Sequence, residues 1–169
     1  MKHPSLPAEF ARYASLSVLG MAAVSCYILA DTFFVARGLG ATGLAALNLA
    51  IPVYNVIHGA GLLLGMGGAT RFAILRSQGA ARRADSVFTH TLAMAAAAAV
   101  VFAALGAFAA PALAALLGAD GATAAMTATY LRVLLLFSPA FLLNDVLVCF
   151  VRNDGAPQLA MAATVSGSL

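Results

Sequence analysis

Residues 13–36 read YASLSVLGMAAVSCYILADTFFVA, a run of 24 residues in which Asp31 is the only charged side chain. As an α-helix this run is about 36 Å long, which covers a hydrocarbon core of about 30 Å with some tilt. It is about twice as long as the apolar part of a signal peptide and lacks the small-residue end of a cleavage site. The stretch therefore predicts a membrane-spanning helix.

The composition of the whole chain also indicates a membrane protein. Of its 169 residues, 63% are hydrophobic and 9% are charged, and the mean hydropathy is +0.97. Soluble domains have about 45–50% apolar and about 25% charged residues. The net charge of +3 is too small and too dispersed to indicate nucleic-acid binding. Cys26 and Cys149 lie within apolar runs, where we expect membrane-buried thiols rather than a disulfide.

Four more apolar runs follow the first, separated by arginines or turn-forming residues. The predicted fold class is an all-α integral membrane protein, a polytopic bundle of four complete transmembrane helices and the start of a fifth. The last run has only twelve residues, about 18 Å of helix, so we expect the N-terminal part of a longer protein. A short N-terminal segment, 1–12, precedes the bundle, 13–169, whose predicted spans are about 13–36, 43–70, 87–110, 124–151 and, incompletely, 158–169.

The basic residues predict how the bundle is oriented. With a cytoplasmic N-terminus, the outer side holds Arg37, and Arg132 lies near the outer end of the fourth span. The other seven basic residues then lie inside: Lys2, Arg12, Arg71, Arg76, Arg82, Arg83 and Arg152. This bias predicts cytoplasmic segments at 71–86 and 152–157 and outer loops at 37–43 and 117–122.

Asp31 lies within the first predicted span, where inserting a carboxylate into the membrane costs a free energy of roughly 2.5–3.5 kcal/mol. An acid at this position therefore indicates a function or a specific partner. At helical spacing it shares a stripe with Ser17, Gly20, Val24 and Tyr27, while the rest of the helix is apolar or small. This polar stripe indicates a helix that faces a cavity. The alternative is that Asp31 lies at the outer headgroups and pairs with Arg37.

The second run has two distinct faces on a helical wheel. Asn48, Pro52, Asn55 and Gly59 share one face, where the asparagines either line a cavity or form hydrogen bonds between helices. The opposite face carries Gly61, Gly65 and Gly68, a ridge of small residues that predicts close helix packing. His58 lies off both faces and is interpreted as a packing residue in preference to a proton carrier.

In the fourth run Pro139 predicts a kink, because proline lacks the backbone N–H of the helix ladder. Tyr130, Ser138, Asn144 and Asp145 fall within a broad arc. Asp145 is about two turns from the cytoplasmic end, and we expect it to extend towards Arg152 rather than to serve a pathway. Asn144 and Asp145 stay candidate cavity-lining residues together with Ser17, Asn48 and Asn55.

The sequence does not favour an enzyme. The spacing of His, Cys, Asp and Glu gives no metal-ligand cluster, so no metal site or cofactor is predicted. No nucleophile elbow, acid dyad or phosphate loop is present, and Gly65–Gly68 lies within a helix without a preceding strand. No catalytic residue is predicted.

Several stretches, taken in order, resemble the MATE (multidrug and toxic compound extrusion) transporters. ILADTFFVARGLG at 28–40 and LAALNLAIP at 44–52 resemble the first two helices of that family. Further along, GMGGAT at 65–70 with Gln78-Gly79, YLR at 130–132 and FVRNDG at 150–155 match in the same order. The resemblance covers nearly the whole chain and is strongest to the prokaryotic DinF-like branch.

This resemblance implies a fold of twelve helices in two lobes, of which residues 13–169 belong to the N-lobe. It implies a multi-pass protein of the bacterial inner (plasma) membrane that exports drugs or organic cations in exchange for H⁺ or Na⁺. Asp31 matches the first-helix aspartate of cation coupling, Tyr27 its neighbouring tyrosine, and Tyr130 a fourth-helix tyrosine. The implied partners are small organic cations, the lipid bilayer and the C-terminal part of the same transporter.

Two other functions compete with antiport. A flippase for lipid or polysaccharide intermediates, from the same superfamily, is expected to line its cavity with several arginines or lysines for a pyrophosphate group. Here the spans hold acids and amides instead. A membrane assembly subunit without transport activity is the alternative from a different class.

Overall fold

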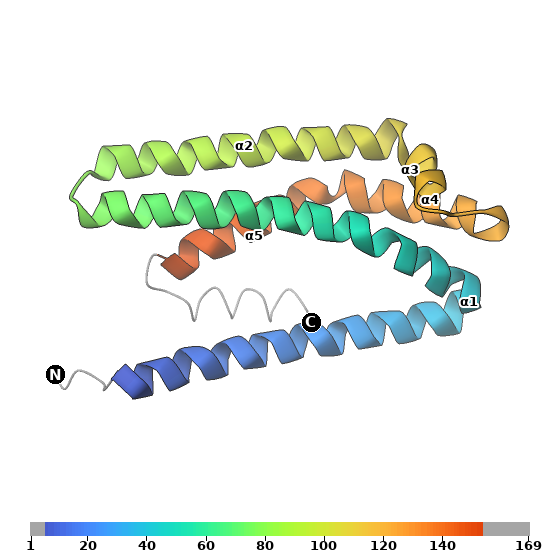
Figure 1. Cartoon of the computed structure of the whole chain (residues 1–169), viewed down its shortest axis with the longest axis horizontal. Coiled ribbons are helices and arrows are strands. Elements are labelled where there is room, and N and C mark those ends of the chain that lie inside the picture. Colours follow the sequence, from blue (N-terminus) through green and yellow to red (C-terminus); the bar gives the residue numbers. More distant parts are fainter. Residues whose placement is uncertain (1–5, 154–169) are drawn as a thin grey trace.

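The structure is a computed structural model that describes residues 6–153, with the side chains between residues 6 and 24 described only in part (Figure 1). Within this part of the chain all regular structure is helical. The five helices are α1 Leu6–Ser77, α2 Ala81–Phe108, α3 Ala110–Leu116, α4 Gly121–Leu136 and α5 Ser138–Asn153. The predicted all-helical class is confirmed.

Helix α1 consists of two limbs that meet at Gly40. This glycine has φ 66° and ψ −157°, a backbone conformation that residues with a Cβ rarely adopt. We call residues 6–39 the first limb and residues 41–77 the second limb. The chain reverses at this glycine, so that the two limbs run in opposite directions (Figure 1). The reversal lies within the loop predicted at 37–43.

The second limb, α2, α4 and α5 form a packed group. From here on, the bundle means these four helical segments and does not include the first limb. A tight turn at Gln78–Ala80, with Gly79 at φ 75°, returns the chain from the second limb into α2. Helix α5 packs against both α1 and α2. The bend of α1 lies at the same end of the molecule as α3 and the start of α4, opposite the turn between α1 and α2 (Figure 1).

The predicted kink in the fourth run is confirmed. Helices α4 and α5 are separated by Phe137 and bent by 47°, with Pro139 as the second residue of α5. Proline at the start of a helix lacks an N–H that would have no partner there, so it begins α5 without loss. Within residues 6–153, two helical stretches are long and apolar enough to span a membrane: Ser25–Ser77, which is part of α1, and the whole of α2. The bent pair of α4 and α5 adds a third if it is one span.

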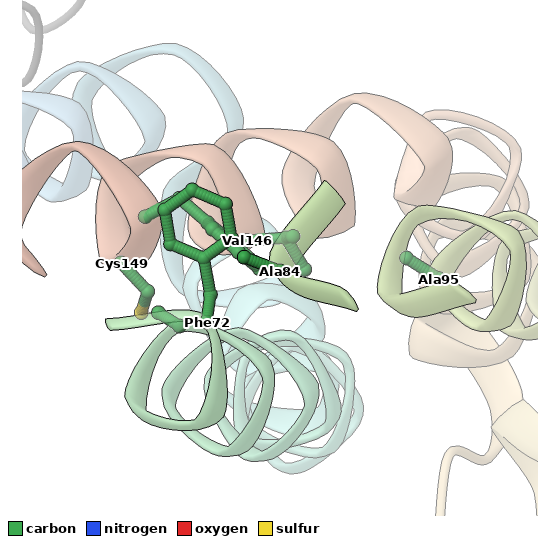
Figure 2. Packing of buried hydrophobic residues seen from close by; sticks show 7 residues of the cluster. Phe72, Ala84, Ala95, Val146 and Cys149 are labelled. Atoms are coloured by element: carbon green, nitrogen blue, oxygen red, sulfur yellow. The ribbon is translucent and has the colours of Figure 1, made fainter. Parts of the chain in front are cut away.

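The interior of the bundle is built largely from small side chains and a few large ones. Near the Gln78–Ala80 turn, Phe72 of α1 and Phe88 of α2 contact Phe150 of α5 edge-on, with ring centroids 5.5 Å and 4.9 Å away. Figure 2 shows how α1, α2 and α5 contribute side chains to this cluster. The buried members of the cluster are Ala69, Phe72, Ala84, Ala95, Val146, Cys149 and Phe150.

The glycine ridge of the second limb is the packing surface that the sequence predicts. A Cβ on Gly61 would lie 2.7 Å from Oδ2 of Asp145, and one on Gly65 would lie 3.0 Å from Sγ of Cys149. Both glycines are buried against α5, and Gly68 lies against Thr91 of α2. The small residues therefore let the helix backbones approach closely, which is how membrane helices commonly associate.

Candidate functional site

The structure brings together the three residues that the family resemblance assigns to cation coupling. Asp31 and Tyr27 lie on the first limb of α1, and Tyr130 lies on α4. Tyr130 is close enough to interact electrostatically with both Asp31 and Tyr27. Asp31 is half-buried, while both tyrosines are exposed at the protein surface. One carboxyl and two phenol groups from distant parts of the sequence thus lie near one another. Asp31, Tyr27 and Tyr130 together are called the Asp31 cluster.

The alternative pairing of Asp31 with Arg37 is absent from the structure. Both side chains are described, and no ion pair joins them within residues 6–153. Arg37 is exposed at the protein surface near the Gly40 break. Asp31 therefore has an electrostatic neighbour on α4, Tyr130, and forms no ion pair with Arg37 six residues further along its own helix.

The second acid, Asp145, is paired with His58. Nδ1 of His58 lies 2.8 Å from Oδ2 of Asp145, so the side chains of α1 and α5 are hydrogen-bonded across the bundle. Asp145 is 8% exposed. The interpretation that its carboxylate extends along α5 towards Arg152 was wrong, because the carboxylate is bonded to His58 on the second limb. Gly61, which has no side chain, leaves room for Asp145 to lie against that limb.

Aromatic rings border this pair. Tyr54, one turn before His58, stacks on the imidazole with a centroid distance of 5.9 Å and an interplanar angle of 5°. Phe141 of α5 meets the Tyr54 ring edge-on at 5.9 Å. The Tyr54 hydroxyl is also within electrostatic range of Asp145 and Tyr27. Tyr54 therefore contacts the His58–Asp145 pair through His58.

Sequence reasoning missed the His58–Asp145 pair and Tyr54. The pair is separated by 87 positions, and no periodic pattern relates residues on different helices. The available signal was a histidine and an acid in two apolar runs, with a glycine one turn after the histidine. Such an arrangement leaves room for an acid on a neighbouring helix, but it does not identify which helix.

The candidate cavity-lining residues are placed differently from one another. Asn48, Asn55 and Asn144 are exposed at the protein surface, as are Pro52 and Gly59 on the same face of the second limb. The asparagine side chains form no hydrogen bond within the described part of the chain, so the alternative of interhelical bonds is not seen there. Asp145 is buried, and the side chain of Ser17 lies outside the described residues.

The remaining polar groups give no metal-ligand set. Within residues 6–153 no group of three or more His, Cys, Asp or Glu side chains lies close enough to hold a metal ion. Cys149 is buried, whereas Cys26 is exposed at the protein surface. The hydroxyls of Thr127 and Ser138 are buried without a hydrogen-bond partner in the described structure. The expected cytoplasmic loop at 152–157 and fifth span at 158–169 lie outside the described residues from position 154 on.

The sequence is similar to known transporters over most of its length. A family model for MatE matches residues 17–169. The multidrug export protein MepA of Staphylococcus aureus strain MRSA252 is 30% identical over 165 residues, which is 95% of this chain and 34% of that protein. MepA of Staphylococcus saprophyticus is 31% identical over 118 residues, covering 70% of this chain and 26% of its own length. The chain spans about a third or less of the curated relatives it matches.

Two solved structures share the fold. One is a MOP superfamily transporter from Pyrococcus furiosus, 31% identical, with a TM-score of 0.79 over 94% of this chain and 35% of that one. It was described as having a binding pocket of reverse polarity that suggests a different function. The other is a multidrug resistance MATE family transporter in an outward-facing conformation, 30% identical, with a TM-score of 0.75 and the same coverage.

Proposed function

This chain belongs to the MATE family, and we propose that it works within an antiporter that exports organic cations in exchange for H⁺ or Na⁺. The apolar helices and the family establish a multi-pass membrane protein of a transporter family. Its relatives in two staphylococci are named as multidrug export proteins. Export by this chain, with a small organic cation as substrate, is inferred from that similarity.

The observation that carries the proposal is the cluster of Asp31, Tyr27 and Tyr130. An antiporter needs a group that binds the driving ion and changes the shape or charge of a cavity when it does so. A carboxylate within an apolar helix is such a group, because its cost in the membrane depends on whether it is charged. Tyr130 of α4 is within electrostatic range of both Asp31 and Tyr27 of α1. Ion binding at Asp31 would therefore act on two helices.

We place this transporter in the bacterial inner membrane with its N-terminus in the cytoplasm and spans at about 13–36, 43–70, 87–110 and 124–151. The Gly40 break and the α3–α4 connection lie at one end of the molecule, and the Gln78–Ala80 turn lies at the other, as alternating spans require (Figure 1). A single cysteine at position 80, in a background without Cys26 and Cys149, should react with an impermeant thiol reagent only from the cytoplasmic side. Labelling from outside would reverse the topology.

The function is tested by Asp31→Asn in the full-length transporter. The amide keeps the size of the side chain and its hydrogen-bonding capacity but cannot change charge. We expect efflux of a fluorescent organic cation from proteoliposomes, driven by a H⁺ or a Na⁺ gradient, to be lost at unchanged protein level. Asp85→Asn is the matched control, because Asp85 is an exposed acid on α2.

Three outcomes would contradict the proposal. Wild-type efflux by Asp31→Asn would remove the coupling role of this acid. Absence of cation efflux from the wild-type protein, with transport of a pyrophosphate-linked lipid instead, would identify a flippase. Absence of transport of either class of compound would favour an assembly subunit.

A further inference from the structure

The His58–Asp145 pair is a second polar site in the bundle that the Asp31 cluster does not include. It joins two helices through a hydrogen bond of 2.8 Å, one partner from the second limb of α1 and the other from α5. The carboxylate is buried, whereas 44% of the His58 side chain is exposed. The imidazole therefore connects a buried acid with the surface of the protein.

The surroundings fix Asp145 in this position. Gly61 lies directly beneath the carboxylate, and a Cβ there would come within 2.8 Å of Cβ of Asp145. Tyr54 stacks on the opposite partner, His58, and Phe141 holds the Tyr54 ring edge-on. Residues of both α1 and α5 thus surround the pair, which distinguishes it from an ion pair between two mobile side chains on the surface.

The hydrogen bond leaves one nitrogen available for a proton. With the neutral imidazole protonated at Nδ1, that N–H donates to the carboxylate and Nε2 is left as an acceptor. Protonation at Nε2 converts a pair of net charge −1 into an imidazolium–carboxylate pair of net charge zero. Because a net charge is costly in the apolar part of a membrane, gain and loss of this proton change the energy of the α1–α5 contact.

The pair is suited to a proton and poorly suited to Na⁺. A hard metal cation is bound by several oxygen ligands. Here one carboxylate oxygen is hydrogen-bonded to an imidazole, and the adjoining residue, Gly61, has no side chain. Histidine, by contrast, exchanges a proton between pH 5 and 8 when its surroundings allow it.

Other titratable groups on the packed elements are few. Tyr54 of α1 and Cys149 of α5 interact electrostatically with Asp145, and Arg152 interacts with Cys149. Helix α4 carries Tyr130 and Arg132. Helix α2 has its charged and histidine side chains within its first ten residues: Arg82, Arg83, Asp85 and His90.

We propose that His58 and Asp145 form a second proton-binding site of the transporter, separate from Asp31. Its basis is the 2.8 Å hydrogen bond between Nδ1 of His58 and Oδ2 of Asp145, together with the burial of the carboxylate. The site would make H⁺ a driving ion of export, a role that rests on the antiport function proposed above. Proton binding by the pair does not depend on that function.

Proton binding is tested without transport. The full-length protein, with ¹⁵N-labelled histidine, is placed in lipid nanodiscs and its imidazole signals are followed between pH 5 and 8. We expect the ring-nitrogen signals of His58 to report the gain of a proton within this range, and their pH dependence to change in Asp145→Asn. The signals of His90, which is exposed and bonded to Ser86 on its own helix, should be the same in the wild-type protein and in Asp145→Asn. A His58 signal that does not titrate, or does not respond to Asp145→Asn, would overturn the proposal.

The coupling role is tested in proteoliposomes with either a H⁺ gradient or a Na⁺ gradient. His58→Asn places an amide near the position of Nδ1 but cannot carry a proton. We expect His58→Asn and Asp145→Asn to reduce H⁺-driven efflux of a fluorescent cation at least tenfold and to leave Na⁺-driven efflux, where present, within twofold. His90→Asn should change neither.

The outcomes separate this proposal from the proposed function. Wild-type H⁺-driven efflux by both variants would overturn the coupling role of the pair, with antiport intact. Equal loss of efflux with both gradients would show a structural role and also overturn it. If the wild-type protein transports with neither gradient, antiport fails, and the linked titration of His58 and Asp145 in nanodiscs still supports the proton site.

Discussion

The first limb of α1 and the bundle each hold an acid within an apolar sequence, and they hold it in different ways. In the bundle, Asp145 is buried, hydrogen-bonded to His58 and seated on Gly61. In the first limb, Asp31 is half-buried and is flanked by exposed apolar side chains; Leu29, for instance, is 70% exposed. Asp145 is fixed by packing, whereas Asp31 is positioned by the direction of its helix.

The difference shows two ways of keeping an acid in a membrane protein. A buried acid needs a partner at hydrogen-bonding distance, because the protein interior offers no water to replace it. An acid on a less covered helix needs only neighbours within electrostatic range, and such neighbours change when the helix moves. The bundle is therefore expected to behave as the fixed part and the first limb as the part whose position depends on Gly40.

The largest expected effect is on the free energy of unfolding, when a large apolar side chain is shortened in the bundle or on the first limb. Leu142 is completely buried between α1, α2 and α4, so Leu142→Ala should lower the free energy of unfolding by about 2–5 kcal/mol. Leu29→Ala, on the first limb, should change it by less than about 0.5 kcal/mol. Thermal or denaturant unfolding in detergent measures both. Similar losses from the two variants would mean that the first limb is packed as firmly as the bundle.

The next effect concerns the junction between the regions. Gly40 has a positive φ, and a Cβ there would meet no other atom within 4 Å, so only the backbone opposes Gly40→Ala. We expect a loss of about 1–3 kcal/mol, or a change in the direction of the first limb. Gly38→Ala is the matched control, because Gly38 also has open space around it and lacks the positive φ.

Both expected outcomes of Gly40→Ala, the loss of stability and the change in direction of the first limb, can be measured. Cross-linking of cysteines at positions 27 and 130 by bifunctional thiol reagents of different length, in a background without Cys26 and Cys149, reports the direction of the first limb, and unfolding reports its stability. Unchanged stability together with unchanged cross-linking would show that the break does not depend on glycine. Helix propensity alone would make Gly38→Ala stabilising, so an equal loss from Gly38→Ala and Gly40→Ala would show that the positive φ of Gly40 is not the cause.

Much of the fold could be predicted from the sequence, because apolar length, glycine spacing and proline act locally. The glycine ridge, the shared face of the asparagines on the second limb and the kink before Pro139 all follow from spacing along one helix. The exposure of the asparagines did not follow from it. The reversal near Gly40 could be placed within a loop for the same reason. The count of complete spans stays a prediction, since the structure gives two or three candidate spans.

The candidate site was predictable only in part. Asp31, Tyr27 and Tyr130 were found through ordered motifs, and the structure places them near one another, while their role in coupling stays a prediction. The partner of Asp145 could not be found from a wheel, because it depends on which helix packs against α5 and at what height. Arg152, seven positions away on the same helix, was the partner that local spacing favoured.

The smallest expected effect compares two glycines on opposite faces of one helical turn. Gly59 has no atom within 4 Å of an added Cβ, so Gly59→Ala should stabilise the protein by roughly 0.5–1 kcal/mol through helix propensity. A Cβ at Gly61 would press on both Cβ and Oδ2 of Asp145, an overpacking cost of about 1–3 kcal/mol. Part of that cost is offset by the same gain in propensity, so Gly61→Ala should destabilise the protein by about 1 kcal/mol. The two substitutions therefore have opposite signs, and unfolding in detergent measures them side by side. If Gly61→Ala is as stabilising as Gly59→Ala, then α5 does not rest on this glycine, and the contact that positions Asp145 for His58 is not the one described.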